Sequence, residues 1–577
     1  MDSKKTILAA LAGIALAAAL TGIRWGLPDS GKAAKLFAPQ WKSGVFFDAL
    51  SSGWQDIYDK ARGSTPLLAE TDGKYSAHLD KAVRVDFTGA LPPKELHNSY
   101  RSMLIRSQYA DESLPLSDLA QMKPERLDFK PPSFLYGGGY LYPLGAYYLA
   151  LSKLGLIQRL PLRRLLENPD AMNGIYAAGR CLSALAFAGL CCLCFLIAGR
   201  LATTRAGTFA FIFALTAPLP LVHAHFMTPH LWAAFWGLLS VYTLLRGMPA
   251  PGLRTMLLSG ICLGISAGSY WSQLHVLIFL AAVALSAGGA FFRREFLFRI
   301  CALAGAGALT FLLLNPYLLI SGKTALREII MGTPPREYSY WANLRSLLTN
   351  TLPGTLGLPC TLAVAGGYVA GLLSPKPVAR MLTAACVIMF FLSATTIPAD
   401  FSAGVRRFFP WLLLSLVPAG LFVDSLFSRT PRLLRLPLLL IVFLPGALLA
   451  AAYEVNFNLA ASPASAFSRM GAMLDAMKPE GRLGLLEFPQ PSCAPHFRLD
   501  RWPLLLATPE EMPKLAAKDL PLYLLVTFHQ KYGVGKLLEE RYALVRGFYP
   551  ARVAGAGVDL AVGNINAQLE LYRLKPL

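Results

Sequence analysis

Long apolar runs separated by short basic turns make up the chain between residues 174 and 452. Ten of these runs approach the roughly 20 residues that a helix needs to cross a bilayer: 174–199, 206–222, 230–245, 255–270, 272–291, 299–320, 352–373, 379–397, 409–427 and 433–452. With 54% hydrophobic and 15% charged residues, the chain lacks the ~25% charge of an ordinary soluble domain. A soluble enzyme, a disordered chain and a disulfide scaffold are thereby excluded.

The basic turns fix the number and direction of the spans. An apolar segment from Ile7 to Ile23 follows a short basic N-terminus, and we read it as an uncleaved first helix rather than as a signal peptide. If residues 137–158 do not cross the membrane, every turn on the same side as the N-terminus is basic, as cytoplasmic turns usually are. The basic residues of these turns are Arg200 and Arg205; Arg246 and Arg254; Arg293, Arg294 and Arg299; Lys376 and Arg380; and Arg429, Arg432 and Arg435. Residues 137–158 are therefore predicted to lie in the outer interface.

These observations predict an α-helical polytopic membrane protein with about 11 transmembrane helices. Its parts would be a first helix (1–23), a large first outer loop with juxtamembrane helices (24–173), helices 2–11 with an outer loop at 321–351 (174–452), and a C-terminal domain (453–577). The last part reads as a small α/β unit, with a helix at 466–477 and strands at 482–488, 520–527 and 569–574. Both large bodies would lie outside the membrane.

An excess of basic residues gives the chain a formal charge of +20. In a soluble protein this would suggest nucleic acid. Here cytoplasmic turns and anionic lipid headgroups account for it, and no basic helix or aromatic platform accompanies it, so no nucleic-acid partner is expected.

Ionisable residues gather at the outer ends of the predicted helices rather than at mid-membrane depth. Transporters place such residues near the middle of the bilayer. The spans here are almost free of carboxylates, apart from Asp424 near an inner end. The distribution therefore favours chemistry at the outer face over passage through the membrane.

Several short motifs, in order along residues 95–425, resemble those of the C-type (GT-C) membrane glycosyltransferases, the group of protein O-mannosyltransferases and lipid A aminoarabinose transferases. They are the Asp111-Glu112 pair after Ser99–Ala110, the Tyr-, Pro- and Gly-rich stretch 128–143, Gly179–Leu185, His223–His230, Asn315–Tyr317 and Arg406–Pro410. Where the family pattern ends in Asp, this chain has His230.

The resemblance implies transfer of a sugar from a polyprenyl phosphate to an acceptor hydroxyl in one inverting step. Asp111 would act as general base, and Glu112 would orient Asp111 or the sugar. Arg406 and Arg407 would hold the leaving phosphate, since a guanidinium matches phosphate oxygens.

Other candidates have weaker support. His225 or His230 would donate a hydrogen bond to the sugar or the phosphate. A metal site is not expected, because the side chains of His223 and His225 point in different directions on a helix. Tyr136 belongs either to an interfacial belt or to a sugar-stacking surface, and Arg180 either anchors a helix end or contacts substrate. Lys323 begins the loop 321–351, which would cover the site.

Two other functions stay open at this level: a transporter or flippase of lipid-linked sugars, and a non-catalytic scaffold. The resemblance places the protein in a bacterial inner membrane with its N-terminus cytoplasmic and its C-terminal domain periplasmic. The expected partners are membrane lipid, a polyprenyl-phosphate-linked sugar and a glycan, lipid or protein acceptor; the sequence names neither the sugar nor the acceptor.

Overall fold

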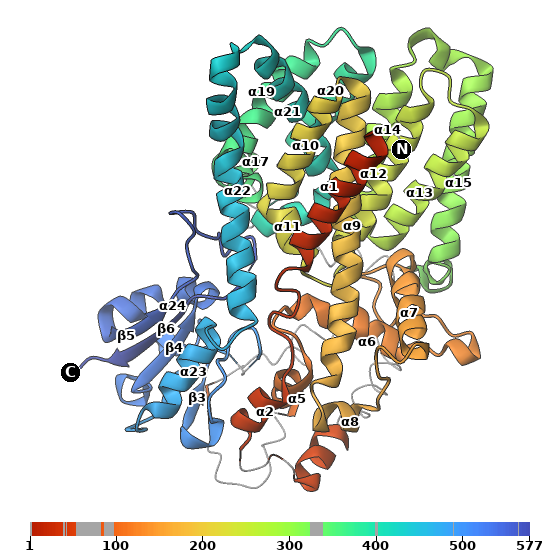
Figure 1. The fold of residues 1–577 in the computed structure, drawn as a ribbon. Coiled ribbons are helices and arrows are strands. Elements are labelled where there is room, and N and C mark those ends of the chain that lie inside the picture. Colours follow the sequence, from red (N-terminus) through yellow and green to blue (C-terminus); the bar gives the residue numbers. More distant parts are fainter. Residues whose placement is uncertain are drawn as a thin grey trace.

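A computed structural model describes residues 3–38, 41, 43–52, 82–85, 97–323, 339–397, 402–487, 490–563 and 565–576. Figure 1 shows a bundle of long helices and, below it, a body built from the first loop and the C-terminal residues. The bundle comprises α1 (Ser3–Leu20), α9 (Ala171–Leu201), α10 (Thr204–Thr216), α11 (Pro218–Ala224), α12 (Pro229–Gly247), α13 (Leu253–Ser269), α14 (Val276–Leu285), α15 (Arg294–Leu314), α17 (Tyr340–Ser346), α18 (Leu352–Leu356), α19 (Leu358–Leu372), α20 (Pro377–Ser393), α21 (Phe409–Arg429) and α22 (Arg435–Ala460).

Several of these helices suit a bilayer. Among the described residues, four segments are long and apolar enough to cross one, Ala171–Leu201, Arg294–Leu314, Gly404–Arg429 and Arg432–Ala460, and two bent pairs raise the number to six. Shorter apolar helices include α13 and α20. Large apolar side chains on the outside of α15 and α22, such as Leu313 and Ile441, are exposed, as expected where lipid covers a surface. The count of eleven spans stays a prediction.

Two predicted spans are bent rather than straight. The run 206–222 forms α10 and α11, which meet at 64°, because Pro218 has no N–H to continue the helix. The run 352–373 is bent by 117° before α19, at Gly357, whose φ of +81° suits glycine. The helical segment also begins at Tyr340, so the predicted outer loop 321–351 is partly helical.

The basic turns gather at one end of the bundle. Arg200 donates to the carbonyl of Arg246, Arg299 to that of Pro251 and Lys376 to that of Leu201. Arg205 pairs with Asp424. We call this the basic end, and the opposite end the loop end.

Helix α7 (Gly138–Lys153) is joined to the loop end. Gly137 N donates to Ser269 O at 3.1 Å, Gly138 N to Asn315 Oδ1 at 3.0 Å, and Trp232 Nε1 to Gly139 O at 2.9 Å. The backbone of Gly137 and Gly138 packs so closely that a Cβ would lie 2.0 Å from a carbonyl oxygen of the bundle. This segment is therefore fixed against the ends of α12, α13 and α15.

The first loop and the C-terminal residues form one body. Its helices are α2 (Ser30–Leu36), α5 (His97–Ile105), α6 (Ser113–Gln121), α8 (Leu162–Glu167), α23 (Ala466–Ala476) and α24 (Phe528–Arg541). Its sheet has the order β1-β3-β2-β4-β6-β5, from β1 (Val83–Val85), β2 (Leu483–Leu485), β3 (Leu504–Leu506), β4 (Tyr523–Thr527), β5 (Tyr542–Phe548) and β6 (Leu569–Leu574). Strand β2 is parallel to β3 and β4, and the other pairs are antiparallel.

The three strands predicted in the C-terminal residues are present as β2, β4 and β6, and the predicted helix is α23. The sequence did not predict that β1, from the first loop, adds to the edge at β3. An ion pair of 2.7 Å between Lys35 of α2 and Asp475 of α23 also joins the two parts.

Candidate active site

Asp111 and Arg406 meet at the loop end of the bundle. Asp111 lies in a short 3-10 helix, η2 (Ala110–Glu112), of the first loop, and Arg406 in another, η7 (Ser402–Phe408), directly before α21. Arg406 Nη1 is 3.0 Å from Asp111 Oδ2, with 21% and 31% of the two side chains exposed. The contact that the enzymatic interpretation requires is thus present between residues 295 positions apart in the sequence.

Tyr109 completes this cluster. Its hydroxyl accepts a hydrogen bond from Arg406 and donates one to Asp111 Oδ2 at 3.2 Å. Its ring stacks on Phe226, with centroids 3.8 Å apart. Burial, followed by the nearby Asp111 carboxylate, raises the pKa of the Tyr109 phenol well above its usual value. Tyr109 therefore keeps its proton and holds one oxygen of Asp111 in place.

Reactive atoms remain available in this cluster. Within the described chain, Asp111 Oδ1 and the Nε and Nη2 atoms of Arg406 have no hydrogen-bond partner. The carboxylate can therefore accept a proton through Oδ1, and the guanidinium can donate to an anion through two further nitrogens.

Glu112 and Arg180 form a buried ion pair behind this cluster. Arg180 donates to both carboxylate oxygens, at 2.8 and 2.7 Å, and neither side chain is exposed. Glu112 also accepts from Ser107 and from Met227 N, and Arg180 donates to the carbonyls of Ile23 and Trp25. Neither residue reaches a surface on which a sugar could bind. The role considered for Glu112, orienting Asp111 or the sugar, stays a prediction.

His230 and His223 lie beside Arg406 in the same region. Both are buried, and neither nitrogen of His230 nor Nδ1 of His223 has a partner within the described residues. The His230 ring is edge-on to Tyr270 at 4.7 Å and to Tyr136 at 6.5 Å, and 5.5 Å from His223. Buried polar atoms without protein partners are rare in native structures, so these nitrogens are candidates for contact with a bound molecule.

His225 is engaged elsewhere. Its Nδ1 and Nε2 lie 3.0 and 2.7 Å from the carbonyl oxygens of Leu221 and Thr21, and its ring stacks on Phe457 at 3.8 Å. Both nitrogens are therefore used in joining α11 to the end of α1, and the hydrogen bond to sugar or phosphate considered for His225 is not available in this structure.

The other predicted residues differ in how closely they approach the cluster. Tyr136 is buried beside His230, and the Arg407 side chain is hydrogen-bonded to Tyr270. Lys323 is exposed, and it is the last described residue before 324–338, so most of the predicted cover lies outside the described residues. Among the described residues, no group of three or more His, Cys, Asp or Glu is arranged to hold a metal ion.

The sequence motifs did not indicate a function for Tyr109, and they assigned no role to His223. Tyr109 is within the quoted motif, two positions before Asp111, but a tyrosine in a polar loop gives no signal of a contact with a distant arginine. Only the fold supplies that contact.

No protein-family model and no curated protein sequence matches the chain. Among solved structures, it is similar to ArnT from Cupriavidus metallidurans in the apo state, with 13% identity over 80% of this chain and 93% of that one and a TM-score of 0.41. ArnT bound to undecaprenyl phosphate gives 12% identity, the same coverage and a TM-score of 0.40. The oligosaccharyltransferase of Archaeoglobus fulgidus in the apo form gives 13% identity over 72% of this chain and 66% of that one, with a TM-score of 0.38.

Proposed function

We propose that the protein is an inverting glycosyltransferase that moves a sugar from a polyprenyl phosphate to an acceptor hydroxyl at the outer face of a bacterial inner membrane. The observation that carries the proposal is the contact between Asp111 and Arg406 at the loop end, opposite the basic turns. A carboxylate and a guanidinium side by side supply the two groups that displacement of a phosphate from a sugar needs: a proton acceptor and an anion binder.

The acceptor hydroxyl would give its proton to Oδ1 of Asp111, the carboxylate oxygen that has no partner among the described residues. Its oxygen then forms a bond to the anomeric carbon from the face opposite the phosphate. The bond from that carbon to the phosphate oxygen breaks, and the phosphate keeps the electron pair. One displacement of this kind inverts the anomeric centre.

The leaving phosphate would lie against Arg406, through Nε and Nη2, and near Arg407. His230 and His223, which have nitrogens without a partner in the described part of the chain, would hydrogen-bond to the phosphate or to the sugar. Tyr136 would form a wall of the sugar site. Glu112 and Arg180 would act through their neighbours, by fixing the segment that carries Tyr109 and Asp111. Lys323 would lie at the edge of the site.

The basic turns also support an orientation. Because basic turns usually lie on the cytoplasmic side of a membrane, the loop end, the sheet and the Asp111 cluster would be periplasmic. A donor anchored by its polyprenyl chain in the outer leaflet would then present its phosphate at the depth of Arg406.

The test is transfer by the purified protein from a synthetic polyprenyl-phosphate donor with a labelled sugar, with envelope lipids and glycans as acceptors. Asp111→Asn should abolish transfer, and Arg406→Gln should lower its rate by roughly 10²–10³, as removal of a charge-stabilising donor commonly does. Asp48→Asn, which changes an exposed carboxylate of the same loop, should have no effect.

Full transfer by Asp111→Asn with a verified donor would refute the base assignment. Movement of the labelled lipid across vesicle membranes, without transfer to any acceptor, would instead favour a transporter.

A further inference from the structure

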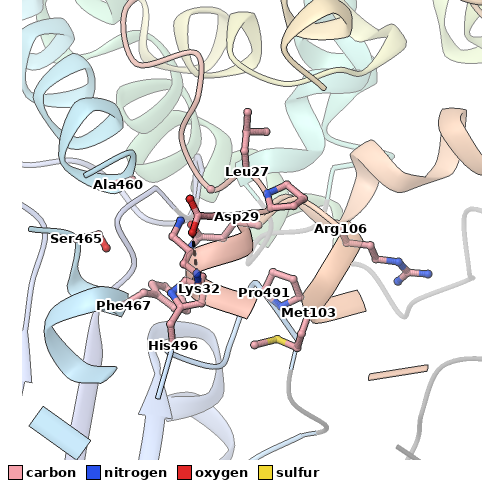
Figure 2. Close-up of a pocket in the computed structure, with 13 residues that line it drawn as sticks. Leu27, Asp29, Lys32, Met103, Arg106, Ala460, Ser465, Phe467, Pro491 and His496 are labelled. Carbon is pink, nitrogen blue, oxygen red and sulfur yellow. Dashed lines mark hydrogen bonds between the residues drawn. The ribbon is translucent and has the colours of Figure 1, made fainter. Parts of the chain in front are cut away.

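A pocket lies between the first loop and the C-terminal residues, in the body below the bundle. The space between its walls, open solvent at the mouth included, is about 420 Å³. Its walls come from the segment after α1, from the end of α5 and the residues that follow it, from the start of α23, and from the loop at Pro491 and His496. Figure 2 shows these segments converging around Lys32.

Lys32 brings a positive charge into this pocket. Within the described chain, its ammonium forms no ion pair or hydrogen bond. Asp29 is nearby, but its carboxylate caps α2 and accepts a hydrogen bond from the backbone N of Lys32 at 2.7 Å. Burial lowers the pKa of Lys32, and Asp29 opposes this effect. A partly desolvated cation of this kind is costly unless an anion joins it.

Two further polar groups of the lining have no partner among the described residues: Nδ1 of His496 and Nε2 of Gln108 are buried and make no hydrogen bond. Burial, helped by the positive charges of Lys32 and Lys35, lowers the pKa of His496 to about 3. The imidazole is therefore neutral at physiological pH and carries one N–H donor. An ammonium, an amide N–H₂ and an imidazole thus line one pocket.

Apart from these groups and the polar side chains of Asp29, Arg106 and Ser465, the lining is apolar. Met103, Phe467 and Pro491 face the same space, and such surface would contact the carbon skeleton of a ligand. The donor atoms call for an acceptor-rich, negatively charged group, and the apolar walls call for an organic body beside it.

We propose that this pocket binds an organic anion, with a phosphate or carboxylate group between Lys32, His496 and Gln108 and an apolar part against Met103, Phe467 and Pro491. The site is separate from the Asp111 cluster and does not depend on the proposed transfer reaction. It does adjoin that cluster along the chain, since Gln108 precedes Tyr109 and three Cα–Cα steps of about 3.8 Å separate Gln108 from Asp111.

The test is calorimetric titration of the purified full-length protein with n-butyl phosphate. Arg406→Gln is used as the background, so that binding at the Asp111 cluster does not contribute. Lys32→Gln should weaken binding by roughly tenfold or more, as loss of a charged hydrogen bond does, whereas Lys32→Arg should retain most of it. Lys35→Gln is the matched control: it removes the same charge from the same helix, but Lys35 is paired with Asp475, and affinity should change by less than about threefold.

Dihexanoyl phosphatidic acid serves as a second probe. Binding of n-butyl phosphate would show that the pocket accepts a soluble organic phosphate. Binding of dihexanoyl phosphatidic acid but not of n-butyl phosphate would show that the pocket binds a lipid headgroup. Absence of binding of both probes to Arg406→Gln would overturn the proposal, as would equal weakening by Lys32→Gln and Lys35→Gln, since diffuse charge rather than a built site would then account for the binding.

Discussion

The carboxylate of Glu112 accepts two hydrogen bonds from the guanidinium of Arg180, and neither side chain has any exposed surface. The adjacent residue, Asp111, is instead partly exposed and contacts Arg406. Two neighbouring acids thus have different environments. Glu112 joins the first loop to Met227 and, through Arg180, to α9 and the residues that follow α1. Asp111 faces the region where substrate would bind.

Removal of one partner from the buried pair should destabilise the protein strongly. We expect Glu112→Ala to lower the free energy of unfolding by about 3–5 kcal/mol, because Arg180 is left buried without a counterion. Urea unfolding in detergent, followed by tryptophan fluorescence, measures this. Glu167→Ala breaks ion pairs of the same loop with partly exposed partners and should cost less than about 1 kcal/mol. Similar losses in the two variants would contradict the role given to the buried pair.

Tyr109→Phe should reduce activity with little loss of stability. The phenylalanine ring still stacks on Phe226, but Asp111 and Arg406 lose the hydroxyl between them. A net hydrogen-bond contribution of about 1 kcal/mol predicts a rate lowered roughly fivefold, measured as transfer from the labelled donor. Tyr147→Phe, on α7, is the control, and an unchanged rate in Tyr109→Phe would show that the hydroxyl does not position Asp111.

Gly138→Ala should disrupt the attachment of α7. An added Cβ would lie 2.0 Å from the carbonyl oxygen of Leu314, which is a backbone atom and cannot rotate away. We expect a loss of folded protein and a lower thermal unfolding midpoint. Gly13→Ala, in α1, places its methyl group in open space and should be neutral or slightly stabilising, since alanine favours a helix. Equal behaviour of the two variants would be inconsistent with this packing.

Acid should destabilise the body that contains the pocket. The pKa of His496 is about 3 in the folded protein, below the 6.5 of a free histidine, so the unfolded chain binds more protons. The contribution of the neutral imidazole to stability is fully present above about pH 6.5 and is lost progressively as the pH falls towards 3. Thermal unfolding midpoints between pH 7.5 and 4.5 measure this loss, and His496→Gln should have a shallower pH dependence. If the unfolding midpoints of the wild-type protein and of His496→Gln changed equally with pH, the role given to His496 would be refuted.

Much of the bundle could be predicted from local sequence. Apolar runs and basic turns identified its helices, because hydrophobicity and charge report directly on the surroundings of each segment. The breaks were not predicted: Pro218 and Gly357 are visible in the sequence, but the size of the bend at each depends on the helices packed around it.

The candidate site was only partly predictable. The motif order indicated Asp111 and Arg406, but it also kept Glu112, Arg180 and His225 as candidates for substrate contact. Burial separates these residues: Glu112, Arg180 and His225 are hydrogen-bonded inside the protein, whereas Asp111 and Arg406 are partly exposed. The edge pairing of Val83–Val85 with Leu504–Leu506 was equally inaccessible, because three-residue strands carry almost no periodicity of their own.

By itself, the sequence determined which segments are apolar enough for lipid, which turns are basic and which short motifs carry acid and guanidinium groups. Only the tertiary structure decided that Asp111 and Arg406 touch, that Glu112 is enclosed and that Lys32, Gln108 and His496 line one pocket. The physical reason is that hydrophobicity and charge belong to single segments, whereas contact and burial arise when segments distant along the chain pack together.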